Sequence, residues 1–202
     1  MASDFIYFIS TLPTLTLPAI PGDTWNAPKW EEFLDKCRSM LSEQDAAAIA
    51  ALKLCPDAAY AQDPQTAGAR MPRLAREWYD WQIVMRNALA RRRAQRLERH
   101  SPAPLPEAQV FPNEMKRLDA LFEAQTPVER AWAWYGLQWR RLDELSSLSG
   151  FSMDSLIAYA LKVLLANEAM RYDRQAGAAA FASMTDGLVA TARERRVAVQ
   201  AE

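Results

Sequence analysis

The chain has 202 residues, of which 50% are hydrophobic and only six are glycine, and its net charge is -1 at pH 7. This composition excludes an intrinsically disordered protein, and the length suits one domain or two small ones with a sizeable core. Two cysteines are too few for a disulfide framework, so we expect a reducing, cytoplasmic environment. The apolar run near the N-terminus follows an acidic residue and precedes a proline, which is unlike a signal peptide. Since no apolar segment is long enough to cross a bilayer, any contact with a membrane is expected through partner proteins.

Prolines divide the first third of the chain into short segments. Three prolines within residues 5–21 predict an extended or irregular N-terminal arm rather than one continuous helix. Apolar residues at helical spacing follow Pro28 and predict a short amphipathic helix. These residues are Trp30, Phe33, Leu34, Cys37 and Leu41. Ser42 with Asp45 resembles the capped start of another helix, and residues 56–72, which are rich in proline, predict a loop.

A long helix is predicted from residue 72 to about residue 100. Its first half carries an apolar stripe of Leu74, Trp78, Trp81, Met85 and Leu89. Its second half is charged on all sides, so we expect this end to project beyond the core. Residues 101–112 contain four prolines and predict a linker. We expect a single helical domain over residues 1–202, with this linker as the point where it could be subdivided.

A well-capped helix is predicted after a short helix at residues 115–122. Thr126 can act as its N-cap, a proline occupies the first helical position, and Glu129 can reach back to the cap. One apolar face then recurs at spacings of three and four. It consists of Val128, Ala131, Trp132, Tyr135, Trp139, Leu142 and Leu145. Trp134 falls off this face, so we expect a second aromatic edge that can face a partner protein.

A second helix should follow at once, antiparallel to the first. Gly150 can take the left-handed conformation that ends a helix, Ser152 is the expected N-cap, and Phe151 is expected to pack on Leu156 as a hydrophobic staple. A final helix is predicted after Gly177. Together the elements predict an all-α bundle of about six or seven helices, with long antiparallel hairpins and an extended N-terminal arm.

The residues that usually carry chemistry do not form a motif. His100 is the single histidine, and neither Cys37 nor Cys55 has a metal-type spacing to the other or to His100. The glycines never form a dinucleotide-binding or phosphate-loop pattern. We therefore predict no catalytic, cofactor-binding or metal-binding residue and no small-molecule substrate. An enzyme whose site is assembled without a motif is the third-ranked alternative.

A cluster of arginines is the strongest charge feature. Residues 70–99 carry nine basic and three acidic side chains, whereas residues 1–69 carry four basic and nine acidic ones. The candidate partner-binding residues are Arg86, Arg91, Arg92, Arg93, Arg96, Arg99 and Trp134. An exposed cationic helix can bind a phosphate backbone, but no aromatic residue for base stacking and no nucleic-acid motif accompanies this one. A solvated face or an acidic protein partner is therefore favoured, with a nucleic-acid-binding or general helical adaptor using residues 86–99 as the alternative.

Three blocks of the sequence carry a resemblance to a known family. They are residues 7–15 (YFISTLPTL), residues 78–94 (WYDWQIVMRNALARRRA) and residues 138–177, which begin QWRRLDELSSLSGFSMD. In this order they resemble a family of uncharacterised bacterial proteins that are encoded among the subunits of V-type ATPases. Members of that family are thought to occupy the place of the C (or d) subunit, the helical socket between the membrane rotor ring and the central axle.

The resemblance implies a non-catalytic, all-helical subunit that couples ATP hydrolysis to ion transport, such as proton transport, only within the assembly. Its partners would be other V-type ATPase subunits, namely the central stalk and the membrane rotor ring. Its place would be cytoplasmic and peripheral to the membrane. One departure is plain: a typical C/d subunit has three similar helical units, and 202 residues are too few for three of the usual size.

Overall fold

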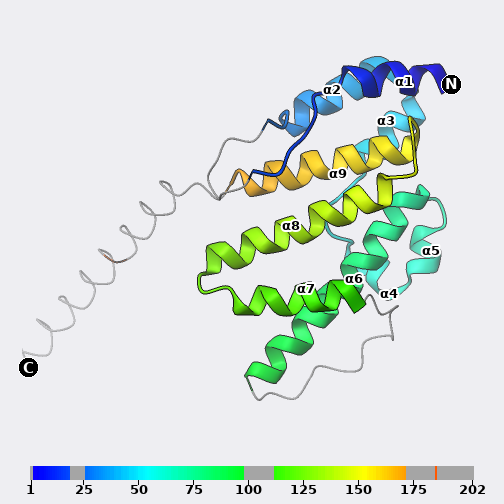
Figure 1. The fold of residues 1–202 in the computed structure, drawn as a ribbon. Helices are drawn as coiled ribbons and strands as arrows, with labels where there is room; N and C mark the ends of the chain where they lie inside the picture. The colour runs from blue at the N-terminus through cyan, green and yellow to red at the C-terminus, as the bar shows by residue number, and fades with distance from the viewer. Residues whose placement is uncertain (1, 19–25, 98–111, 172–184, 186–202) are drawn as a thin grey trace, which may run out of the picture.

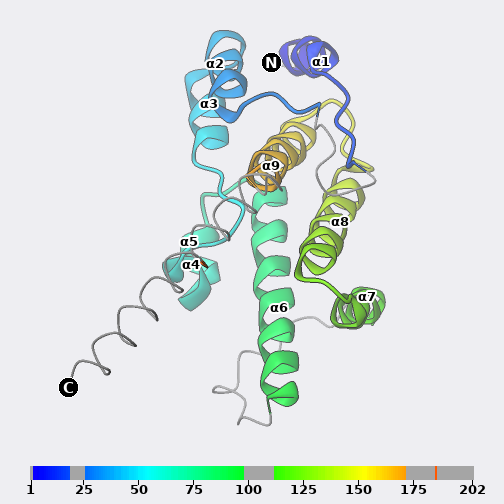
Figure 2. The ribbon, with the colours of Figure 1, turned by 90° about the vertical axis from the view of Figure 1, so that its left-hand side faces the viewer.

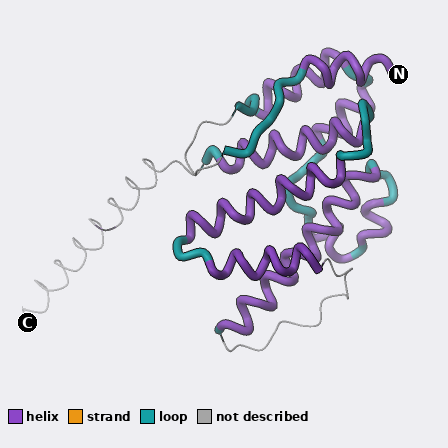
Figure 3. Tube along the Cα trace, in the orientation of Figure 1, coloured by secondary structure: helices purple, strands orange, loops and turns teal. Residues whose placement is uncertain are grey.

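The computed structural model describes residues 2–18, 26–97, 112–171 and 185, and over these residues it is helical without a strand (Figure 1, Figure 3). The predicted all-α class is therefore confirmed for the described part of the chain. Nine helices lie there, seven of them with at least seven residues. They are α1 (Ala2–Thr11), α2 (Trp30–Met40), α3 (Glu43–Ala50), α4 (Ala58–Gln62), α5 (Pro64–Gly68), α6 (Arg73–Arg96), α7 (Pro112–Glu123), α8 (Pro127–Ser146) and α9 (Met153–Ala169). The helix predicted after Gly177 lies outside the described residues.

Helix α9 lies at the centre of the arrangement. It packs against α1, α2, α3, α6 and α8, and Figure 1 shows it between the α1–α2 layer and its antiparallel neighbour α8. A helix that is apolar on most sides has to be surrounded by other elements, and α9 is such a helix. Its buried residues are Leu156, Ile157, Ala158, Ala160, Leu161, Val163, Leu165, Ala166 and Ala169. The predicted antiparallel hairpin of α8 and α9 is thus the central unit of the fold.

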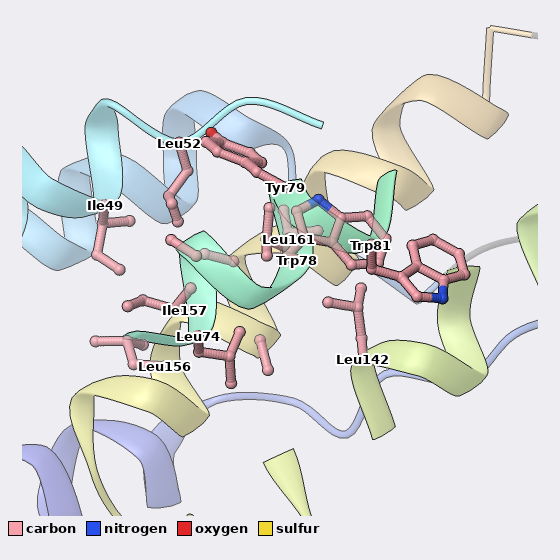
Figure 4. Packing of buried hydrophobic residues seen from close by; sticks show 14 of the residues in the cluster. Ile49, Leu52, Leu74, Trp78, Tyr79, Trp81, Leu142, Leu156, Ile157 and Leu161 are labelled. Atoms are coloured by element: carbon pink, nitrogen blue, oxygen red, sulfur yellow. The ribbon is translucent and has the colours of Figure 1, made fainter. Parts of the chain in front are cut away.

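The core is built around two stacked indoles on α6. The rings of Trp78 and Trp81 have centroids 5.2 Å apart and both are almost fully buried (Figure 4). Around them pack aliphatic side chains of α6, α8 and α9, which Figure 4 shows as Leu74, Leu142, Leu156, Ile157 and Leu161. Helices before and after residues 98–111 contribute to this one cluster. A subdivision at residues 101–112 stays a prediction.

The ends of α8 and the start of α9 follow the local sequence signals. The Thr126 side chain accepts from the Glu129 backbone N–H, and the Glu129 carboxylate accepts from Thr126 N–H, so both halves of the predicted capping box are present. Gly150 has φ +55°, the left-handed conformation expected of it. Ser152 occupies the N-cap position of α9, but its side chain makes no capping hydrogen bond. The predicted starts of both helices are therefore confirmed, whereas α8 ends at Ser146, with Ser147 as its C-cap, about one turn before the predicted end at Gly150.

Two side chains that were predicted to pack are exposed instead. Val128 is 59% exposed because it lies in the first turn of α8, at the end of the molecule where α7 turns into α8 (Figure 1). Phe151 is 57% exposed, whereas its expected staple partner Leu156 is fully buried among the core residues. The prediction of a hydrophobic staple was therefore wrong in its main consequence, since Phe151 adds little to the burial of Leu156.

The N-terminal arm is half helix. Residues 2–11 form α1, which corrects the expectation of an irregular segment, because the first proline stands only at position 13 and leaves the preceding backbone free to coil. Phe8 is fully buried and stacks on Phe33 of α2 with ring centroids 6.4 Å apart. The extended part is residues 12–18. It is held against the α8–α9 hairpin by Tyr159, whose hydroxyl donates to Pro13 O at 3.0 Å.

The segment at residues 56–72 contains α4 and α5 and is not the predicted loop. Asp57 and Asp63 cap these helices by accepting hydrogen bonds from Tyr60 N–H and Thr66 N–H. Tyr60 is then buried edge-on against Tyr79 of α6, with ring centroids 5.2 Å apart. The prolines of this segment predict a loop only if they interrupt a helix. In α5 the proline stands in the first helical turn, where it is compatible with a helix.

Candidate partner-binding surface on α6 and α7

The arginine-rich half of α6 leaves the core and meets α7. Both ribbon views show the C-terminal end of α6 extending past α8, and α7 crosses α6 in Figure 1 and is seen end-on beside it in Figure 2. The end of α6 is not solvated on all sides, because Ala94 is buried. Leu97, just after the helix, is exposed. Of residues 91–97 only Ala94 is buried, so this end projects as predicted except along one face. One face of the charged half is covered by α7.

The structure separates the predicted arginines into two groups. Arg92 forms an ion pair with Asp119 of α7, with Nη2 and Oδ1 2.7 Å apart, and the Arg96 guanidinium lies 5.2 Å from the centroid of the Phe122 ring. Arg86 points elsewhere: its Nε donates to Gln82 Oε1 at 3.4 Å and its guanidinium contacts the sulfur of Cys55. Arg91 and Arg93 are exposed on α6, and Arg99 lies outside the described residues.

Arg91, Arg92 and Arg96 line a groove between α6 and α7. It consists of two adjoining hollows of about 400 and about 200 Å³ that share Arg92, Gln95 and Asp119. We call this the α6–α7 groove. Its lining residues are Ala88, Arg91, Arg92, Gln95, Arg96, Met115, Leu118, Asp119, Phe122 and Glu123. The α6 side supplies the cations, and α7 supplies most of the apolar surface together with two carboxylates.

Sequence reasoning missed the contribution of α7. Asp119 and Phe122 lie 27 and 26 positions after the arginines that they meet, so no local pattern connects them. The amphipathic spacing of Met115, Leu118 and Phe122 was visible, but it indicated only a core helix. The polar residues between them could be assigned to a site only after α7 was placed beside α6.

Trp134 lies against the core. Its ring is partly buried and stacks on Trp81, with centroids 6.1 Å apart and planes inclined by 13°. The residue is therefore a packing element of the α6–α8 contact, and only part of its side chain reaches solvent. That this part touches a partner stays a prediction.

A buried polar cluster lies where α6, α7 and α8 meet. Gln82 Nε2 donates to Gln138 Oε1 at 2.8 Å, and both side chains are inaccessible or nearly so. Glu114 is 5% exposed, with Oε1 at 3.9 Å from Arg141 Nη1. Burial raises the pKa of the Glu114 carboxyl, and the nearby Trp81 N–H and Arg141 guanidinium offset part of that rise. The cluster links three helices.

The carboxylates of this cluster face a guanidinium. Glu114 and the nearby Glu144 both approach Arg141 Nη1, at 3.9 and 3.6 Å, and the charge of Glu144 adds to the rise in the pKa of Glu114. Among the residues that the structure describes, no three His, Cys, Asp or Glu side chains come together as a metal ion would require. Cys37 is fully buried, which raises the pKa of its thiol to about 12 and makes it a poor nucleophile.

The comparisons with known proteins add no family. No protein-family model matches the sequence, and neither the curated proteins nor the solved structures contain a significant match. Within residues 2–18, 26–97 and 112–171, no helix combines the length and apolar character needed to span a membrane. The class that the structure defines is an all-helical protein with a cationic groove beside its core.

Proposed function

We propose that this chain is a non-catalytic coupling subunit of a bacterial V-type ATPase, in the position of the C/d-like rotor-stalk socket. In that place it would transmit rotation between the central stalk and the membrane rotor ring, so that ATP hydrolysis drives ion transport. It would reside on the cytoplasmic side and meet the membrane only through its partners. The proposal rests on the sequence resemblance, and one structural observation supports it.

The supporting observation is that the three resembling blocks pack on one another. The first and third blocks are joined by the hydrogen bond from the Tyr159 hydroxyl to Pro13 O at 3.0 Å. The second and third are joined by the Gln82–Gln138 bond of 2.8 Å. All three also contribute to one buried cluster, through residues such as Phe8, Trp78 and Leu161. A shared fold would place its resembling segments in such a common core.

Recovery of ATPase subunits with the endogenous protein is the direct test. The tagged chain would be pulled down from gently solubilised membranes of its own cells, beside an untagged strain, and the bound proteins identified by mass spectrometry. We expect central-stalk and rotor-ring subunits in the tagged sample alone. Recovery of the chain as a pure monomer, with no ATPase subunit, would contradict the proposal.

Two further measurements follow from a non-catalytic role. Calorimetry of the purified chain with magnesium and ATP should show no binding, and one site of micromolar affinity would contradict the role. Replacing Arg91, Arg92 and Arg93 by Gln should slow association with the ATPase sector and flatten its salt dependence, since exposed charges act mainly on encounter. An unchanged association rate with an intact fold would remove these arginines from the interface.

A nucleic-acid-binding adaptor is the second candidate, and the consecutive exposed arginines on α6 are the observation that favours it. One feature of the groove weighs against it. The Arg96 guanidinium lies over the Phe122 ring, 5.2 Å from its centroid, so that face of the ring is not free to stack on a base. Fluorescence anisotropy with a generic RNA decides the matter: submicromolar binding at moderate salt would move this candidate ahead.

A further inference from the structure

We infer that the α6–α7 groove binds an acidic amphipathic helix of a partner protein, with apolar residues in its two hollows and carboxylates facing the α6 arginines. The inference deepens the proposed function, since it names the kind of segment that such a coupling subunit would bind. The occupant follows from the shape of the groove and the charge along its edges.

The lining of the groove suits the apolar stripe of a helix. Met115 and Phe122 of α7 and Ala88 of α6 are partly exposed along the hollows, whereas Leu118 lines the second hollow but is only 1% exposed. The two hollows adjoin each other along this line. A helix laid into such a groove anchors through residues spaced three and four apart, which is a common mode of peptide recognition.

The charge around the groove selects an acidic partner. The lining carries three arginines, Arg91, Arg92 and Arg96, against the carboxylates of Asp119 and Glu123, and the exposed Arg93 lies beside them on α6. Arg92 and Arg96 lie at the groove in contact with Asp119 and the Phe122 ring. Carboxylates of a partner therefore meet two guanidinium groups along the α6 edge.

The Arg92–Asp119 pair does not close the groove. Both side chains are about half exposed, and an ion pair this exposed contributes little to stability. An incoming carboxylate can share the Arg92 guanidinium with Asp119, since that group has several donors arranged in a plane. The remaining carboxylate, Glu123, lies at the α7 edge, so the partner's acidic residues should face α6.

The test uses the whole purified chain and three fluorescent, helix-stabilised peptides of about 14 residues, or four turns. One peptide has leucine at spacings of three and four with glutamate elsewhere. The second replaces glutamate by lysine, and the third replaces leucine by serine. Anisotropy is read at low and moderate salt. We expect only the leucine–glutamate peptide to bind, and more weakly as the salt concentration rises.

Variants then locate the binding. The double change Arg92→Gln and Arg96→Gln should weaken binding of the leucine–glutamate peptide by about five- to tenfold. This corresponds to less than about 1 kcal/mol of binding free energy for each exposed cation. The matched control is Arg38→Gln with Arg171→Gln, which removes the same charge from two exposed arginines on α2 and after α9 that also have carboxylate partners. Gln95→Trp fills the shared part of the hollows without changing any charge and should also weaken binding.

Several outcomes would overturn the inference. They are equal binding of the lysine or serine peptide, an equal loss in the control double variant, and no loss with Gln95→Trp. Displacement of the peptide by generic RNA of higher affinity would assign the groove to nucleic acid instead. Peptide binding that appears only after Leu105, Val110 and Phe111 are changed to Ser would mean that residues 98–111 of this chain, and not a partner helix, compete for the groove. The peptide assay contains only the purified chain and no ATPase subunit. A failure of the groove inference can therefore be told apart from a failure of the pull-down that tests the proposed function.

Discussion

Replacing Gln138 by Leu should destabilise the protein because it leaves a buried donor without an acceptor. Gln82 is 0% exposed and Gln138 is 4% exposed, and the bond between them is 2.8 Å long. The Gln82 side chain has no exposed surface through which water could replace the lost partner without a local rearrangement. An unsatisfied buried polar group costs about 1–3 kcal/mol, so we expect a loss of that size in the free energy of unfolding.

The double change should cost less than the two single changes together. Gln82→Leu alone removes the donor to Gln138 Oε1 and also the weaker contact with Arg86 Nε at 3.4 Å. With leucine at both positions neither amide is left unpaired, and leucine has a volume close to that of glutamine. We expect a coupling free energy of at least about 1 kcal/mol between the two sites, which a double-mutant cycle measures directly.

Urea unfolding followed by circular dichroism gives the four free energies of this cycle, and thermal melting checks them. For a chain of this size about 1 kcal/mol corresponds to about 2–4 °C, so each single variant should melt roughly 2–12 °C lower. Gln95→Leu, on the exposed side of the same helix, is the matched control and should change little. Additive effects within about 0.5 kcal/mol, or single effects no larger than the control, would refute the buried hydrogen bond.

Three further predictions concern single residues. Burial raises the pKa of Glu114 in the folded state, so its contribution to stability is greatest below the ordinary pKa of glutamate and is lost as pH rises through the raised value. The stability of Glu114→Gln relative to wild type should therefore rise from about pH 4 to about pH 7, and a flat difference would contradict this. Thr126→Ala removes the N-cap of α8 and should lower the free energy of unfolding by about 1 kcal/mol, whereas Thr126→Ser should lower it little. Thermal melting measures both variants, and equal melting temperatures would show that the cap is unimportant. Gly150→Ala should cost roughly 1–2 kcal/mol from its left-handed backbone alone, because no atom lies within 4 Å of the added Cβ. Gly150→Asn should cost less, and the reverse order would mean that side-chain packing controls this turn.

The candidate surface was only half visible in the sequence. Arg91, Arg92 and Arg93 are consecutive and Arg86 and Arg96 lie within five residues of them, so the positive charge of this helix was predicted from the sequence, and exposure was expected from the polar pattern around them. The partner of each arginine could not be predicted from the sequence. Arg92 and Arg96 meet Asp119 and Phe122, whereas Arg86 meets Gln82 and Cys55, and only the crossing of α6 by α7 decides between these surroundings.

Signals that act within one turn were determined by the sequence alone. The capping box of Thr126 and Glu129, the Ser42 cap of α3 and the left-handed Gly150 depend on backbone atoms a few positions away, so their neighbours are known before the chain folds. The apolar stripe of α6 is equally local, because helical periodicity places Trp78, Trp81 and Met85 on adjoining parts of the helix surface.

Tertiary structure decided everything that depends on which surface lies opposite. The caps of α4 and α5 are local, but the burial of Tyr60 against Tyr79 joins α4 to α6 across the whole of α5. Val128 and Trp134 belong to the same helix, yet the residue expected in the core is exposed and the one expected at a partner edge stacks on Trp81. Periodicity specifies which residues share a face of a helix, but the free energy of burial depends on whether another helix covers that face, and this is set by contacts between residues far apart in the chain.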